Sequence, residues 1–164
     1  MNVIIRSATE RDLPSITEIY NDAILHTTAT FDTDVKTLED RKQWFANHTE
    51  RHPILVAVHE DKVVGWASLS RWSDRCAYET TVEVSVYVDS NFRGAGIGKQ
   101  LMEKITREGK NTGAHNIISR ITSGNDMSIH IHELLGYEHV GVLKEVGKKF
   151  GKYLDVIIMQ KVFQ

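Results

Sequence analysis

The chain has little of what would tie it to a membrane, to nucleic acid or to an oxidising compartment. Its one cysteine, Cys76, excludes a disulfide within the chain and is typical of a reducing compartment. No apolar run approaches the roughly 20 residues that a membrane helix needs, and the first residues lack the pattern of a signal peptide. The formal net charge of −2 provides no general attraction to phosphate backbones. We therefore expect a soluble, cytoplasmic protein with no nucleic-acid or membrane partner.

Linker-like sequence is equally scarce. There are only two prolines, Pro14 and Pro53, and no repeat, low-complexity tract or stretch rich in proline, glycine and serine. A length of 164 residues is that of one ordinary domain, and a hydrophobic content of 41% is enough for a core. The simplest interpretation is one domain over residues 1–164.

Apolar periodicity predicts strands and helices in mixed order. Strands are expected at 3–6, 54–59, 63–70, 82–88, 116–122, 137–146 and 153–163, and helices at 9–26, 37–49, 96–109 and 125–136. The strand at 82–88 is the clearest, because four valines alternate with Glu83, Ser85 and Tyr87. This order favours an α/β or α+β domain with one central sheet.

A glycine-rich segment, 93–99, directly follows that strand and opens the third helix. Glycines let a ligand approach the backbone closely, and the free N–H groups at a helix start favour an anion. The segment therefore has the construction of a pyrophosphate site. A P-loop would need glycine at position 93 and serine or threonine at 100, where the chain has Arg93 and Gln100. A dinucleotide fingerprint would need glycine at position 99, where the chain has Lys99.

The pattern that does fit is Arg-x-x-Gly-x-Gly, met by Arg93, Gly96 and Gly98. It resembles the acetyl-CoA loop of the GNAT superfamily of N-acetyltransferases. Three further segments match that superfamily in order: 5–12, 83–88 and 124–137. The segment 72–83, with Ser128 and His132, resembles the subfamily that acetylates phosphinothricin and methionine sulfoximine.

The resemblance implies a GNAT fold, a mixed and mostly antiparallel sheet flanked by helices. It also implies acetyl-CoA as co-substrate, no metal, a small amino-acid-like amine as acceptor, and a homodimer, for which residues 156–159 could extend a shared core. The cofactor-binding residues implied are Val86, Tyr87, Val88, Arg93, Gly94, Ala95, Gly96, Ile97, Gly98, Lys99 and Asn125. The acceptor-binding residues implied are Phe31, Trp72, Arg75 and Tyr78.

Glu83 is the candidate general base for removing a proton from the acceptor ammonium group. A carboxylate among alternating valines is costly unless it has a partner or faces a cleft. The alternative is a charge on the solvent face of an ordinary strand.

Asn125, Ser128 and His132 are spaced by three and four residues and so share one face of the predicted helix. The resemblance implies that Asn125 contacts the cofactor and that His132, assisted by Ser128, protonates the leaving thiolate. The alternative is that Asn125 only caps the helix and His132 is a surface histidine.

Two other functions fit parts of the sequence. Acetylation of a protein or peptide amine would use the same loop, and a non-catalytic acyl-CoA sensor would keep the Arg93 loop without needing Glu83. No histidine or asparagine spacing marks Cys76 as a nucleophile, so direct transfer is favoured over an acetyl-enzyme.

Overall fold

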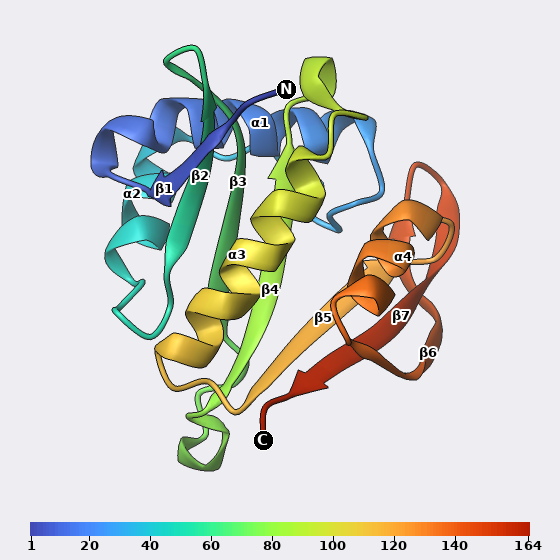
Figure 1. Ribbon diagram of the computed structural model, residues 1–164. Helices are drawn as coiled ribbons and strands as arrows, with labels where there is room; N and C mark the ends of the chain where they lie inside the picture. The colour runs from blue at the N-terminus through green and yellow to red at the C-terminus, as the bar shows by residue number, and fades with distance from the viewer.

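A computed structural model describes residues 1–164 and contains one seven-stranded sheet with helices on both faces (Figure 1). In chain order the elements are β1 (Ile4–Ser7), α1 (Leu13–His26), α2 (Leu38–Ala46), β2 (Ile54–His59), β3 (Lys62–Arg71), β4 (Thr81–Val88), α3 (Ile97–Asn111), β5 (Asn116–Thr122), α4 (Asp126–Leu134), β6 (Glu138–Lys149) and β7 (Lys152–Val162). Short 3-10 turns lie at Glu10–Asp12, Cys76–Tyr78 and Ser90–Phe92. None of the helices combines the length and apolar character that crossing a bilayer requires.

The sheet has the order β1-β2-β3-β4-β5-β7-β6, and every neighbouring pair except β4 and β5 is antiparallel. The predicted mixed, mostly antiparallel sheet is therefore confirmed. The predicted strand at 116–122 coincides with β5, and the other strands agree to within a few residues.

The second predicted helix is shorter than expected. Thr37 caps α2: its Oγ1 accepts the Asp40 N–H at 3.1 Å, and the Asp40 carboxylate accepts the Thr37 N–H at 2.9 Å. The helix ends at Ala46 rather than at Thr49. Asn47, His48 and Thr49 have low helix propensity and supply no apolar group for packing, so nothing extends the helix.

Two apolar clusters lie on opposite faces of the sheet. On one face, α1 packs Leu13, Ile16 and Ile24 against Val56 and Trp66. On the other face, α3 packs its buried residues Ile97, Leu101, Met102 and Ile105 against Leu69, Val84 and Ile117. Since successive side chains of a strand point to opposite faces, Val84 faces α3 while Glu83, Ser85 and Tyr87 face the α1 side.

The one parallel pair is short, and this positions the site. β4 and β5 pair only at Thr81–Glu83 with Asn116–Ile118. Beyond these three pairs the two strands diverge, as Figure 1 shows. β5 continues along β7 as far as Thr122, and β4 continues along β3 as far as Val88. From Val84 onward the edge of β4 that faces β5 therefore has no strand partner.

Candidate active site

Two cavities meet where β4 and β5 diverge. The larger cavity, about 840 Å³, extends from the Arg93–Lys99 loop to α4. The smaller cavity, about 490 Å³, lies between the loop after α1, β4, β5 and β6. Both are lined by Val86, Tyr87, Asn125, Ser128 and His132. A molecule bound in the larger cavity can therefore present one end to the smaller.

The glycine-rich loop forms one end of the larger cavity. Gly94 and Gly96 both have φ near +80°, and a Cβ added at either would meet no atom within 4 Å, so both faces are open. Gly96 is the N-cap of α3, whose first-turn N–H groups have no intrahelical partner. Arg93 and Lys99 add exposed positive charge. This arrangement fits a pyrophosphate.

Not every predicted cofactor residue lines the larger cavity. Val86, Tyr87, Val88, Asn125 and the loop residues other than Ala95 do so. Ala95 instead packs against the core cluster beneath α3. Asn125 also caps α4, because its Oδ1 accepts the Ser128 N–H at 3.3 Å.

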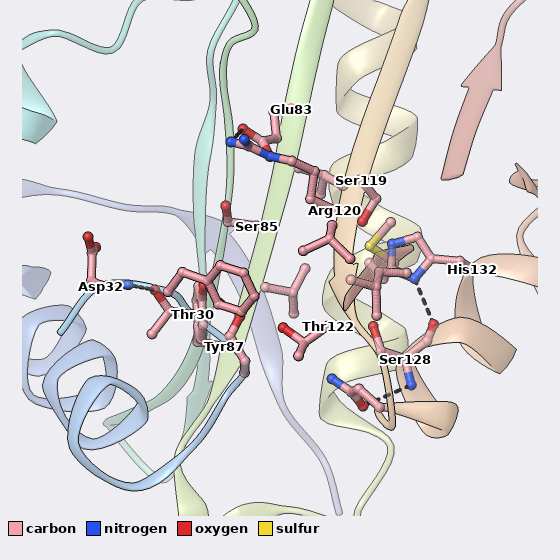
Figure 2. Close-up of a pocket in the computed structure, with 18 of the residues that line it drawn as sticks. Thr30, Asp32, Glu83, Ser85, Tyr87, Ser119, Arg120, Thr122, Ser128 and His132 are labelled. Atoms are coloured by element: carbon pink, nitrogen blue, oxygen red, sulfur yellow. Dashed lines mark hydrogen bonds and ion pairs between the residues drawn. The ribbon is translucent and has the colours of Figure 1, made fainter. Parts of the chain in front are cut away.

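Glu83 lies in the smaller cavity and has a partner that the sequence did not reveal. Arg120 of β5 donates from Nε to Glu83 Oε2 at 2.5 Å and from Nη2 to Oε1 at 2.7 Å (Figure 2). The carboxylate hydrogen bond raises the pKa of Arg120. Glu83 pairs in register with Ile118, so the period of two along β5 places Arg120 beside it on the same face. Arg120 can therefore be identified as the partner of Glu83 only once the pairing of β4 with β5 is known.

His132 is buried rather than on the surface, with 5% of its area exposed, and it lines both cavities. Its Nδ1 donates to the Ser128 carbonyl oxygen at 2.7 Å, while its buried Nε2 has no protein partner. Burial lowers the pKa of His132. At neutral pH the protein therefore holds a neutral imidazole whose Nε2 presents a lone pair and can accept a proton.

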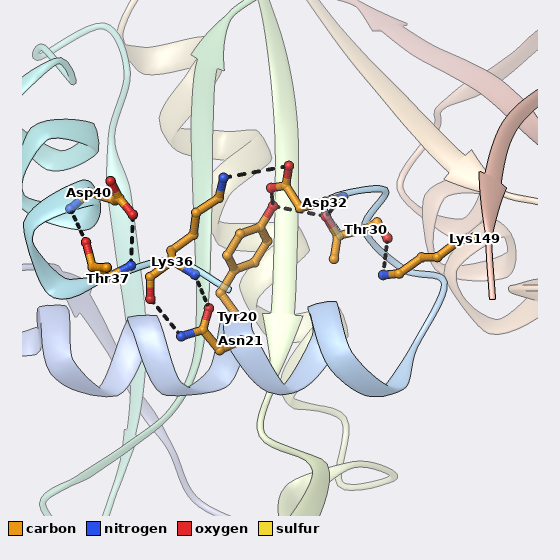
Figure 3. Close-up of polar contacts among 8 residues, drawn as sticks. All are labelled: Tyr20, Asn21, Thr30, Asp32, Lys36, Thr37, Asp40 and Lys149. Carbon is orange, nitrogen blue, oxygen red and sulfur yellow. Dashed lines mark hydrogen bonds and ion pairs between the residues drawn. The ribbon is translucent and has the colours of Figure 1, made fainter. Parts of the chain in front are cut away.

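A polar network holds the loop that walls the smaller cavity (Figure 3). The Tyr20 hydroxyl donates to the Asp32 carboxylate and lies 3.0 Å from Thr30 Oγ1. Lys149 of β6, itself buried, donates from Nζ to the Thr30 carbonyl oxygen at 2.7 Å. Tyr20, Thr30 and Asp32 all line the smaller cavity, although sequence reasoning singled out none of them.

Phe31, on the same loop, lines the smaller cavity as the resemblance implies. Its ring lies against Gly147 of β6, where an added Cβ would come within 2.1 Å of Phe31 Cε2. The ring and the neighbouring Thr30–Lys149 contact therefore both join this loop to β6.

The other implied acceptor residues, Trp72, Arg75 and Tyr78, line neither cavity of the single chain. Arg75 and Tyr78 are exposed at the 3-10 turn Cys76–Tyr78. Trp72 lies nearer, with its ring centroid 5.6 Å from the guanidinium carbon of Arg120. Acceptor binding by these three residues stays a prediction.

Comparison with known proteins identifies the fold and the activity class. Residues 5–158 match the acetyltransferase (GNAT) domain family. The chain belongs to the GNAT acetyltransferase family. As a GNAT member with curated N-acetyltransferase relatives, it is an N-acetyltransferase.

Three relatives illustrate how close the likeness is. An L-methionine sulfoximine/L-methionine sulfone acetyltransferase of Pseudomonas paraeruginosa is 41% identical over 98% of this chain and 94% of its own. A GNAT phosphinothricin acetyltransferase structure from Sinorhizobium meliloti, in complex with acetyl-CoA, superposes with a TM-score of 0.95 at 34% identity, covering 99% of this chain and 89% of that one. A ribosomal-protein-alanine N-acetyltransferase structure from Brucella melitensis has a TM-score of 0.95 at 42% identity, covering 98% and 99%.

Burial of His132 predicts a pH-dependent stability. The pKa of His132 is lower in the folded protein than in the unfolded chain, so the unfolded chain binds the proton more readily. The contribution of His132 to the free energy of unfolding is therefore fully present above about pH 6.5 and is lost as the pH falls through the pKa of the folded state. We expect urea denaturation to give a smaller drop in the free energy of unfolding between pH 7 and pH 5 for His132→Gln than for the wild type. His130→Gln, on the exposed side of the same helix, is the control and should keep the wild-type slope. An equal drop in the free energy of unfolding between pH 7 and pH 5 in all three proteins would contradict a lowered pKa of His132.

Proposed function

We propose that residues 1–164 form one cytoplasmic N-acetyltransferase domain that uses acetyl-CoA to acetylate the α-amino group of a small amino acid of the methionine sulfoximine or phosphinothricin type. The observation that carries the proposal is the junction of the two cavities at the divergence of β4 and β5, with the Glu83 carboxylate in the smaller one. The names of the relatives support the acceptor class. The exposed, unpaired Cys76 supports a reducing compartment.

The residues of the larger cavity fit acetyl-CoA along its length. The open glycines, with Arg93 and Lys99, suit the pyrophosphate. The unpartnered edge of β4 at Val86–Val88 offers backbone N–H and C=O groups to the amides of the pantetheine arm. The acetyl thioester is then delivered at the gap, beside Ser128 and His132.

Glu83 begins the chemistry by accepting a proton from the acceptor ammonium, which frees the nitrogen lone pair. A C–N bond forms as the amine attacks the thioester carbonyl, and an unpartnered N–H of β4 is available to the developing oxyanion. His132 Nε2 accepts the second proton of the nitrogen and returns it to sulfur as the C–S bond breaks. The products are an acetamide and CoA.

A second acceptor class is favoured by one relative, since the Brucella melitensis structure is that of a ribosomal-protein-alanine N-acetyltransferase. The smaller cavity favours a free amino acid, because the Phe31 loop and β6 both wall it. CoA release should be measured with L-methionine sulfone, L-methionine sulfoximine, phosphinothricin and a peptide with N-terminal alanine. We expect turnover of the free amino acids. Turnover of the peptide alone would favour the second class, and no release with any amine would favour a non-catalytic binder.

Replacing Glu83 by glutamine keeps the shape of the side chain but removes its basicity. We expect Glu83→Gln to lower kcat at pH 7 by about 10²- to 10⁴-fold, with partial recovery at higher pH as free amine becomes available. Calorimetry should find acetyl-CoA affinity nearly unchanged. Glu79→Gln, an exposed carboxylate that pairs with Arg51, is the control. Near-normal kcat in Glu83→Gln would mean that bulk water takes the proton.

Replacing Gly96 by valine tests the pyrophosphate site. Gly96→Val puts a side chain into the open face of the loop and should weaken acetyl-CoA binding by at least about tenfold in calorimetry. Gly113→Val is a matched control: it too has a positive φ and open space, but it lies outside both cavities. Thermal unfolding should report similar backbone strain in both variants. Equal acetyl-CoA affinity in both would argue against the loop as the pyrophosphate site.

A homodimer is the assembly that the exposed apolar residues of β6 favour. The residues first considered for a shared core are largely internal, because Val156 and Met159 are buried within the chain. Four apolar side chains of β6 are exposed instead: Val140, Val142, Leu143 and Val146. Leu143 and Val146 also line the smaller cavity, so a second copy over β6 would help to enclose the acceptor.

Sedimentation at micromolar concentration should find a wild-type dimer and a monomeric Val140→Glu, Val142→Glu double variant. Ile4→Glu, which changes an even more exposed apolar residue on β1, should remain dimeric. A monomeric wild type would exclude the dimer.

A further inference from the structure

Arg120 is the only lysine or arginine among the residues that line the smaller cavity. An α-amino acid brings a carboxylate into this cavity, and a carboxylate removed from water needs a cationic or hydrogen-bonding partner. Arg75, which the sequence suggested for this part, lies outside the cavity. The cation best placed to receive the acceptor carboxylate is therefore Arg120.

Arg120 is already engaged, and its partner is the candidate base. Its Nε and Nη2 donate to both oxygens of Glu83, at 2.5 and 2.7 Å. A carboxylate that accepts two charge-assisted hydrogen bonds is a poor acceptor for a further proton, because protonation would break at least one of them. While this pair is intact, Glu83 is therefore not free to act as the base.

The pair is placed where an incoming zwitterion can separate it. The ammonium and carboxylate of an α-amino acid are attached to one carbon atom, so their partners must stand side by side, as Glu83 and Arg120 do. The exchange leaves no charged group without a partner: the one pair in the protein is replaced by two, Arg120 with the acceptor carboxylate and Glu83 with its ammonium. The side chain of Arg120 is 54% exposed and that of Glu83 is 20% exposed, so the pair is partly solvated and separating it costs less than separating a fully buried pair.

Arg120 also has a second contact, with an aromatic ring, that can remain during the exchange. The Trp72 ring centroid lies 5.6 Å from its guanidinium carbon, within the range of a cation–π contact. This contact comes from the loop after β3 and does not involve Glu83.

We propose that Arg120 binds the carboxylate of the acceptor amino acid and, in doing so, releases Glu83, so that the base acts only when an acceptor with a carboxylate occupies the smaller cavity. Arg120 thereby determines specificity and positions the base. The proposal rests on the proposed function, since it takes the acceptor to be an amino acid.

The test compares one acceptor in two forms, L-methionine sulfone and its carboxamide, by steady-state CoA release. We expect wild-type kcat/KM to be about ten- to a hundredfold lower for the carboxamide, with part of the loss in kcat because Glu83 stays paired. Arg120→Gln should lose this preference and should turn over the carboxamide with a higher kcat than the wild type does. A role confined to structure predicts no such gain. Arg120→Lys, which keeps the charge but lacks the planar fork, should retain part of the preference.

Arg107→Gln is the matched control, because Arg107 is an exposed arginine on α3 whose partner is Glu103 and which lines neither cavity. The proposal is overturned if Arg120→Gln keeps the wild-type ratio of acid to carboxamide, or if Arg75→Gln abolishes that ratio while Arg120→Gln leaves it intact. Unchanged acetyl-CoA affinity in calorimetry verifies that the Arg120 variants are folded.

A binding measurement separates failure of this inference from failure of the proposed function. Calorimetry with CoA bound instead of acetyl-CoA measures the affinity for methionine sulfone and for its carboxamide, because no acetyl group can then be transferred. If none of the tested amino acids supports CoA release by the wild type, the proposed function fails. The assignment of Arg120 would still be supported if the wild type binds the acid more tightly than the carboxamide and Arg120→Gln abolishes this difference. Equal binding of acid and carboxamide by the wild type would overturn it.

Discussion

The divergence of β4 from β5 is the constraint on which the rest of the site depends. Three register pairs hold the strands together, after which β4 follows β3 and β5 follows β7. The separation leaves backbone polar groups of β4 without a strand partner at the centre of the protein, and such groups need a ligand or water. It also joins the two cavities. A sheet with β4 and β5 paired to their ends would have neither the free edge nor the passage.

The helices on the two faces fix what lies on each side of this opening. On one side, α3 is anchored by Ile97, Leu101 and Ile105, all essentially without exposed area. Since Ile97 is the first residue of α3, the glycine loop before it is held at the mouth of the larger cavity. On the other side, the loop after α1 is tied to β6 through Thr30 and Lys149. The helix behind the proposed anion site is thus anchored, and the proposed acceptor cavity is walled by the loop and β6.

Charge is distributed along this path according to the chemistry. Exposed Arg93 and Lys99 stand at the loop, a neutral His132 lies at the junction, and the Glu83–Arg120 pair lies in the smaller cavity. A neutral imidazole at the junction suits a group that accepts a proton and passes it on. A paired carboxylate in the smaller cavity suits a base that an acceptor of complementary charge can free. The formal net charge of −2 contains none of this information, because it sums groups that lie in separate cavities.

Local sequence determined the elements and the glycine-rich loop at 93–99. The valine alternation in β4, the glycines before α3 and the caps Thr37 and Asn125 each act through their immediate neighbours, so they can be read without a fold. Tertiary structure decided the rest. The partnership of Glu83 with Arg120 joins residues 37 positions apart through a strand pairing that no local pattern specifies. The burial of His132 accompanies its edge-on contact with the buried ring of Tyr137. The place of Arg75 and Tyr78 outside both cavities depends on where the turn after β3 projects, and only the packed chain fixes that direction.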